Sequence, residues 1–187
     1  TAMGTITPLA SVAWTAGANG LWSNAANWTG GALPDGNNVL AVTIPSDVTV
    51  TFDNSVGDTT LNTLTSLGNL KMAGGNLSTS GNLSTVAYQQ TSGSINVGGS
   101  MSVTQSFAKE DAGSLKMAGG SITQSAGDLV INDGISWTTN LLTLNAQNNI
   151  DINAALNVSG TAGLALEYGQ ANLNAGNTSS YNVNEPV

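Results

Sequence analysis

The sequence predicts an all-β parallel solenoid, or β-helix, preceded by a tryptophan-rich segment. Three observations lead to this prediction. Short apolar-x-apolar triplets recur along the chain, successive triplets begin only six to eight residues apart, and one stretch is repeated almost unchanged further along. Alternation with a period of two indicates strands, and internal repeats of tens of residues indicate solenoids or propellers.

The triplets predict strands of about three to five residues, separated by Gly, Asn or Ser. Three steps of six to eight residues make a coil of about 21 residues, and each coil of a β-helix pairs with its neighbours ~4.8 Å away. Hairpins and sandwiches need longer strands and explicit turns. The triplets lie at 70–72, 95–97, 101–103, 115–117, 129–131, 135–137, 142–144, 150–152, 156–158 and 164–166.

The internal repeat relates residues 70–77 to residues 115–122 at an offset of 45 residues, which is close to two coils. A propeller blade also has about this length, but it needs four longer strands, so the short step between triplets favours the solenoid. The repeat predicts that its four apolar residues point inward at equivalent places two coils apart and that its lysines point outward. These inward residues are Leu70, Met72, Leu115 and Met117, and the outward lysines are Lys71 and Lys116.

Glycine pairs directly follow several predicted strands, where the chain must turn a corner and positive φ is useful. They are Gly74-Gly75, Gly98-Gly99 and Gly119-Gly120. Asn tolerates the same left-handed conformation and can form side-chain ladders between coils.

Residues 5–62 have a different pattern and are expected to form a cap with short strands, whereas residues 63–187 form the repeats. A turn is expected at 33–36 and a strand pair at 39–44 and 48–52. Residues 1–4 look like a cloning remnant. Three tryptophans, Trp14, Trp22 and Trp28, are clustered in this segment.

A solenoid end exposes unpaired backbone groups and apolar side chains, and buried aromatic rings can cover it. We therefore expect Trp14, Trp22 and Trp28 to be mostly buried. The alternative interpretation is an aromatic platform for sugars, which makes these three residues the candidates for ligand binding.

The charge balance excludes several classes of partner. Only 7% of the residues are charged, and the chain has three lysines, no arginine and a net charge of −8. Binding to nucleic acids or to anionic membranes needs clustered Lys or Arg, so both kinds of binding are disfavoured. No run of apolar residues approaches the ~20 that a membrane-spanning helix needs. Low charge can also accompany disorder, but 40% of the residues are hydrophobic and recur regularly, so a core can form.

The residue types also argue against an enzyme and against a cofactor. The absence of His and Cys excludes Ser-His-Asp and Cys-His machinery and ordinary zinc sites, and no phosphate-binding loop occurs. Asp128, Asp133 and Asp151 are the carboxylates to consider for glycoside cleavage, because Asp128 and Asp151 are about one coil apart and could stack. As an alternative, all three are solvated turn residues.

Metal binding is not expected either. Asp-rich turns can hold calcium, yet the Gly-Gly-x-Gly-x-Asp pattern is absent and residues 35–38 are better explained as a turn. Catalytic residues and metal ligands are therefore predicted to be absent.

Residues 142–156, together with 163–166 and 181–184, resemble the repeats of filamentous-haemagglutinin-like exoproteins of bacterial two-partner secretion. The tryptophan-rich opening is similar to segments that precede such repeats in bacterial surface proteins. The resemblance implies a right-handed parallel β-helix, secretion to the bacterial cell surface through a cognate outer-membrane transporter, and a role in adhesion, biofilm cohesion or display of a tip. The family's N-terminal secretion domain carries Asn-Pro motifs, and none occurs here, so an internal β-helical segment is implied.

These observations together predict a structural or adhesive segment of a secreted bacterial surface protein. Its expected partners are host or matrix glycans or surface proteins, and the open end of a solenoid favours end-to-end self-association. The alternative from a different class is a polysaccharide-binding or polysaccharide-cleaving module, in which the Trp cluster or Asp128 and Asp151 would act. A long aromatic-lined groove would favour the alternative.

Overall fold

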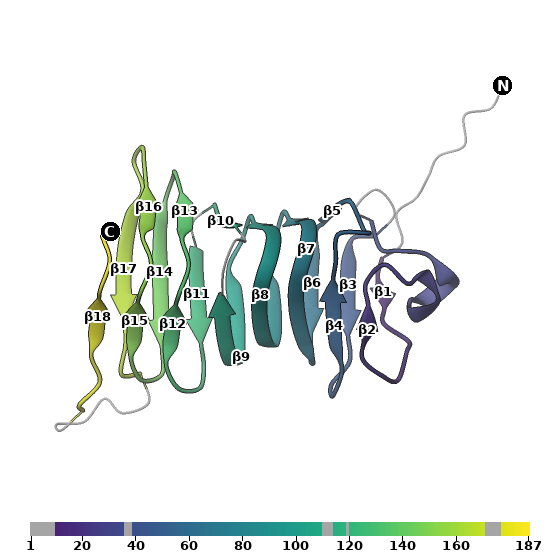
Figure 1. Ribbon diagram of the computed structural model, residues 1–187, viewed down its shortest axis with the longest axis horizontal. Coiled ribbons are helices and arrows are strands. Elements are labelled where there is room, and N and C mark those ends of the chain that lie inside the picture. The colour runs from purple at the N-terminus through teal and green to yellow at the C-terminus, as the bar shows by residue number, and fades with distance from the viewer. Residues whose placement is uncertain (1–9, 36–38, 110–113, 119, 171–176) are drawn as a thin grey trace.

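The computed structural model describes residues 10–35, 39–109, 114–118, 120–170 and 177–187. These residues form eighteen strands and two short 3-10 turns, and the strands pair in parallel with strands of neighbouring coils to make a solenoid of about six coils. The coils are stacked along the long axis of the molecule, from β1 and β2 at one end to β18 at the other (Figure 1). The predicted all-β parallel β-helix is confirmed.

The strands fall into three columns, which we call faces 1, 2 and 3, and each coil runs through the faces in that order. Face 1 contains β1 (Val12–Ala13), β3 (Ala41–Ile44), β6 (Thr63–Ser66), the starts of β8 (Leu83–Val97) and β9 (Met101–Lys109), β11 (Gly120–Gln124), β14 (Leu141–Ala146) and β17 (Gly163–Glu167). Face 2 contains β2 (Gly20–Leu21), β4 (Thr49–Phe52), the start of β7 (Asn69–Thr79), the middle of β8, the end of β9, β12 (Leu129–Ile131), β15 (Ile150–Ile152) and β18 (Tyr181–Val183). Face 3 contains β5 (Asp58–Leu61), the ends of β7 and β8, β10 (Ser114–Met117), β13 (Ile135–Trp137) and β16 (Leu156–Val158).

Alternate residues of each strand point into one continuous core, as the period of two predicts. Leu70, Met72, Leu115 and Met117 are all buried, whereas Lys71 is half-buried and Lys116 is exposed. The predicted inward and outward assignment is therefore confirmed for the repeat.

The predicted equivalence of the two copies of the repeat is wrong. On face 2, Leu70 is in register with Tyr88, which is in register with Phe107 one coil further on. Leu115 lies instead on face 3, in register with Ile95, which is in register with Leu77. The offset of 45 residues corresponds to two coils plus one face, because these coils are shorter than the ~21 residues that the triplet spacing predicts.

The tryptophan-rich segment is joined to the same columns of strands. The predicted strands at 39–44 and 48–52 are present as β3 and β4, but the prediction that they pair with each other is wrong. They are consecutive faces of one coil, because β3 pairs with β1 and β6 while β4 pairs with β2 and β7. The parallel columns therefore include strands of residues 5–62 as well as of residues 63–187. The suspected cloning remnant at 1–4 and Gly36 of the predicted turn lie outside the described residues.

Two devices turn the chain at the corners between faces. The first is a hydrogen bond from an inward-facing side chain to the backbone carbonyl two residues further along, which gives that corner carbonyl a partner on the core side. Thr79, Thr85 and Gln124 each donate such a bond. Glycines provide the second device. At Gly93, φ is +80°, and a Cβ atom would lie 2.6 Å from the carbonyl carbon of Gly74 in the preceding coil.

Candidate functional site

The three candidate tryptophans form a buried cluster at the N-terminal end of the solenoid. Trp14, Trp22 and Trp28 are 3%, 0% and 2% exposed. The ring of Trp28 lies 5.0 Å from that of Trp14 and 4.6 Å from that of Trp22, and Trp22 packs on Phe52 of β4. Their expected burial is confirmed. A sugar stacks on an exposed ring face, and the packing leaves these rings without one.

A hydrogen-bonded carboxylate links the tryptophan segment to the first coil. Asp53 follows β4 and accepts hydrogen bonds from Ser23 Oγ at 3.0 Å and from the Ser55 backbone N–H at 2.9 Å. Burial alone would raise the pKa of Asp53, but the bonds from Ser55 and Ser23 outweigh it and hold that pKa below its ordinary value. We interpret Asp53 as a structural tie.

The candidate carboxylates at Asp128 and Asp151 do not stack as the sequence spacing suggests. Asp151 is in register with Val130, and Asp128 instead accepts hydrogen bonds at 3.0 Å from the backbone and the side chain of Asn149. Asp151 accepts a 2.6 Å bond from the Nδ2 of Asn182 in the next coil. Both carboxylates belong to polar ladders on the outside of face 2, and a third ladder links Asn132, Asn153 and Asn184. Asp128 and Asp151 therefore do not stack, although their spacing in the sequence allowed it.

Asp133 forms an ion pair with Lys109, which the sequence did not reveal. The Lys109 side chain is fully buried at the end of β9, in register with Ile131, and its Nζ contacts Asp133 Oδ2. Asp133 is 31% exposed, and its other oxygen accepts a 2.7 Å bond from the Gly134 backbone N–H. The pair holds β9 against the corner between β12 and β13. Asp133 is thus an ion-paired corner residue and not a freely solvated one.

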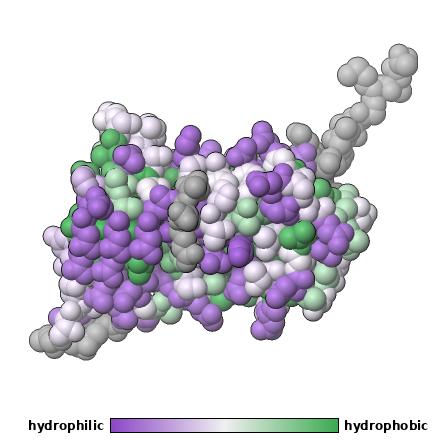
Figure 2. All heavy atoms as spheres, viewed as in Figure 1, coloured by the Kyte–Doolittle hydropathy of each residue, from purple (hydrophilic) through white to green (hydrophobic). Residues whose placement is uncertain are grey.

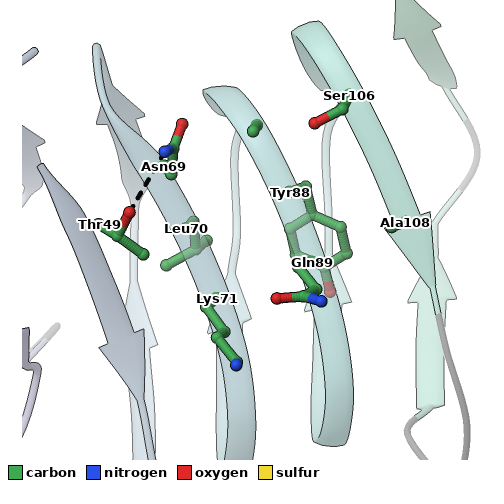
Figure 3. Close-up of a pocket in the computed structure, with 9 residues that line it drawn as sticks. Thr49, Asn69, Leu70, Lys71, Tyr88, Gln89, Ser106 and Ala108 are labelled. Carbon is green, nitrogen blue, oxygen red and sulfur yellow. Dashed lines mark hydrogen bonds between the residues drawn. The ribbon is translucent and has the colours of Figure 1, made fainter. Parts of the chain in front are cut away.

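The outer surface offers two grooves that contain a lysine. The first is a cavity of about 260 Å³ on face 2, and Figure 3 shows Lys71 and Gln89 projecting from the adjacent strands β7 and β8 beside the small residues of β9. Asn69 Nδ2 donates a 3.2 Å bond to Thr49 Oγ1 at its edge. Behind the strands, the ring of Tyr88 is buried, which raises the pKa of its hydroxyl well above the ordinary value, and that hydroxyl donates to Gln90.

The second lysine-containing groove is longer and lies on face 3, and we call it the face-3 trough. It joins cavities of about 450 Å³ and 260 Å³ that share Asn96 and Lys116. Asn96, Lys116 and Ser136 are in register on the adjacent strands β8, β10 and β13 and point outward. The trough is lined by Asn76, Leu77, Ser78, Ser94, Ile95, Asn96, Ser114, Lys116, Met117, Ala118, Ser136, Trp137, Thr138 and Thr139.

The sequence contained a signal for this trough that the prediction missed. Asn96, Lys116 and Ser136 are the middle residues of three predicted triplets and are spaced twenty residues apart. The spacing is one coil, but triplets on all three faces look alike in the sequence, so the shared face appears only with the register.

A third groove is acidic. Asp35 and Asp58 line a cavity of about 610 Å³ near the N-terminal end of face 3, and Asp58 accepts a 2.6 Å bond from Asn76 Nδ2. No group of three or more metal-ligating side chains occurs among the described residues. Two carboxylates make a poor calcium site, since calcium takes six to eight oxygen ligands.

Of these features, the face-3 trough is the candidate functional site. It presents hydroxyl, amide and ammonium groups on a rigid sheet, which suits the binding of a polar ligand. None of the described residues that line it is a carboxylate.

Comparison with known proteins identifies no relative. No protein-family profile, no curated protein and no solved structure matches the chain. In the part of the chain that the structure describes, no helix is long and apolar enough to cross a membrane.

Proposed function

We propose that this chain is a structural and adhesive segment of a secreted bacterial surface protein of the filamentous-haemagglutinin-like kind. The observation that carries the proposal is a stacked β-helical rod with small polar side chains on its outside and a shallow polar trough on one face. A rigid rod extends a binding surface away from a cell, and a shallow surface of hydroxyl and amide groups suits glycans or surface proteins. Hydrophilic atoms dominate the visible face over the C-terminal coils (Figure 2).

The secretion route is part of the proposal. The resemblance of residues 142–156 to exoprotein repeats favours export through a cognate outer-membrane transporter. A chain without cysteine that folds by adding coil to coil suits passage through a pore in an unfolded state, because each new coil finds a preformed edge to pair with. Antibodies raised against the purified chain should label intact cells of the source bacterium. Labelling only after the cells are lysed would contradict the proposed location.

The adhesive role is tested with beads coated with the purified chain. They should bind to host cells or to extracted biofilm matrix more than beads coated with an unrelated acidic β-protein. A glycan array with the same protein then separates glycan partners from protein partners. Binding no greater than that of the control protein on every surface would contradict an adhesive role.

The alternative function is that of a polysaccharide module. The same trough supports the binding of a polysaccharide. Cleavage has less support, because Asp128 and Asp151 are out of register and each is tied into a ladder. Incubation with a polysaccharide panel, followed by an assay for new reducing ends or unsaturated products, distinguishes the two. Release of products that is lost on Asp128→Asn or Asp151→Asn would establish the enzyme instead.

A further inference from the structure

We propose that the face-3 trough binds one extended acidic oligosaccharide, which lies along the solenoid axis with a sugar carboxylate at Lys116. This inference rests on the proposed adhesive function and names its ligand class. Asn96 and Lys116 line both cavities of the trough, so the two cavities adjoin along one face. The groove crosses β7, β8, β10 and β13, which are four successive coils.

The side chains along the centre of the trough are not used by the fold. Ser78, Asn96, Lys116 and Ser136 are in register, and none of them makes a side-chain hydrogen bond with the described residues. The neighbouring outward column behaves differently, since Asn76 donates to Asp58 and Ser114 donates to Ser94 at 2.9 Å.

Face 2 makes the contrast sharper. There, outward Asn and Asp side chains bond from coil to coil, as in the ladder of Asn132, Asn153 and Asn184. Asn96 lies in an outward column of the same kind, yet its amide makes no such bond with the described residues. The central column of the trough therefore has donors and acceptors that make no side-chain bond with the described residues, unlike the Asn and Asp ladders of face 2.

Lys116 places a positive charge at the centre of the trough although the chain is acidic. Lys116 forms no ion pair with any described residue, and no described carboxylate lines either cavity, although Asp58 accepts a bond from Asn76 at the β7 end of the trough. Asp58 lies on the same face but three coils away, which is about 14 Å at ~4.8 Å per coil. That distance exceeds the Debye length of about 8 Å at physiological salt, so the field of Lys116 is locally uncancelled by Asp58.

An extended acidic glycan fits this pattern better than other anions. The coil spacing of ~4.8 Å is close to the length of one sugar unit, so successive sugars meet successive rows of hydroxyl and amide groups. A single cation is enough to bind one carboxylate, whereas a nucleic acid needs several. Trp137 lines the larger cavity but is only 2% exposed, so it forms a wall without an open stacking face.

The test uses titration calorimetry with a tetramer of β-1,4-linked mannuronic acid and with the corresponding neutral mannose tetramer, at low and at physiological salt. The acidic tetramer should bind and the neutral one should bind at least about tenfold more weakly, because a charge-assisted hydrogen bond is worth about one such factor or more. Lys116→Gln should lower affinity for the acidic tetramer by about tenfold. Ser136→Trp, which fills the trough from an outward position, should abolish binding while circular dichroism stays unchanged.

Lys71→Gln is the matched control, because it removes an equal charge from the groove on face 2. Equal losses for Lys71→Gln and Lys116→Gln, or no loss for Lys116→Gln, would overturn the inference. No binding of the acidic tetramer would overturn it as well. If the acidic tetramer does not bind but coated beads still adhere to cells, the proposed adhesive function stands without this ligand. If neither the tetramer nor the beads bind, both the ligand and the adhesive function are rejected.

Discussion

At the scale of single residues, substitutions at neighbouring positions of one strand should affect stability very differently, because alternate side chains are buried and exposed. Met72 and Lys71 are adjacent in β7, but Met72 is fully buried and Lys71 projects into the face-2 groove. Met72→Asp places a carboxylate in the apolar core, which costs several kcal/mol and is comparable with a typical total stability of about 5–15 kcal/mol. We expect this variant to be unfolded at neutral pH and Lys71→Ser to change stability by less than about 0.5 kcal/mol. Thermal melts by circular dichroism decide, and similar melting temperatures would contradict the assignment.

The Lys109–Asp133 pair predicts an asymmetric response at the residue scale. Asp133→Asn removes a carboxylate that contacts a fully buried ammonium group, and we expect a loss of about 1 kcal/mol or more. Lys109→Met leaves only a partly exposed carboxylate that water can reach, so it should be nearly neutral or stabilising. Urea unfolding at pH 7 measures both variants. Asp151→Asn is the matched control on the surface, and a loss for Asp133→Asn no larger than for the control would show that the pair contributes little.

At the scale of the elements, the triplets predict nearly every strand of the repeats but not the face on which each lies. The sequence distance between residues in register varies from 18 between Leu70 and Tyr88 to 31 between Ile150 and Tyr181. A prediction that uses one average coil length therefore assigns residues to the wrong register after two coils. This variation is why the equivalence predicted for the copies of the repeat at 70–77 and 115–122 is wrong, and why a separation of 23 residues does not bring Asp128 and Asp151 into register.

The trough was hidden for the same reason. Asn96, Lys116 and Ser136 become one site only through the register of β8, β10 and β13. The buried tryptophans were easier to predict, since three large rings close together in a chain with few aromatics need an apolar environment wherever the strands lie.

At the corners between strands, a glycine can be needed for two reasons: a positive φ, or a close approach to the backbone of the neighbouring coil. Two glycines, compared as Ala variants, distinguish the free-energy costs of these two reasons. Gly93 and Gly127 have φ values of +80° and +83°, but an added Cβ atom meets Gly74 backbone at 2.6 Å only at Gly93. Both changes to Ala should cost about 1–2 kcal/mol for the left-handed conformation, and Gly93→Ala about 1–3 kcal/mol more for the clash. Urea unfolding of the two variants measures the difference. Equal losses would show that the stacked corners have room to move apart.

At the scale of the whole molecule, the two ends of the rod differ. At the N-terminal end, Trp14, Trp22 and Trp28 are buried against the first coil. At the other end, β18 pairs only with β15 among the described strands, and its side chains are exposed. Tyr181, Val183 and Val158 are 51%, 44% and 43% exposed, so apolar surface and an unpaired strand edge occur together.

This asymmetry predicts how the isolated chain behaves in solution. The exposed apolar side chains lie at the β18 end, so self-association should join two C-terminal ends, each contributing the same surface. Burying the exposed side chains there gains ~25 cal/mol per Å² of apolar area. In hydrogen exchange, residues 164–187 should exchange fastest at low protein concentration and gain protection as concentration rises. Tyr181→Ser should weaken that gain without changing protection around Trp22. Uniform protection along the rod, or fast exchange in the tryptophan segment, would place the weak end of the molecule on the opposite side.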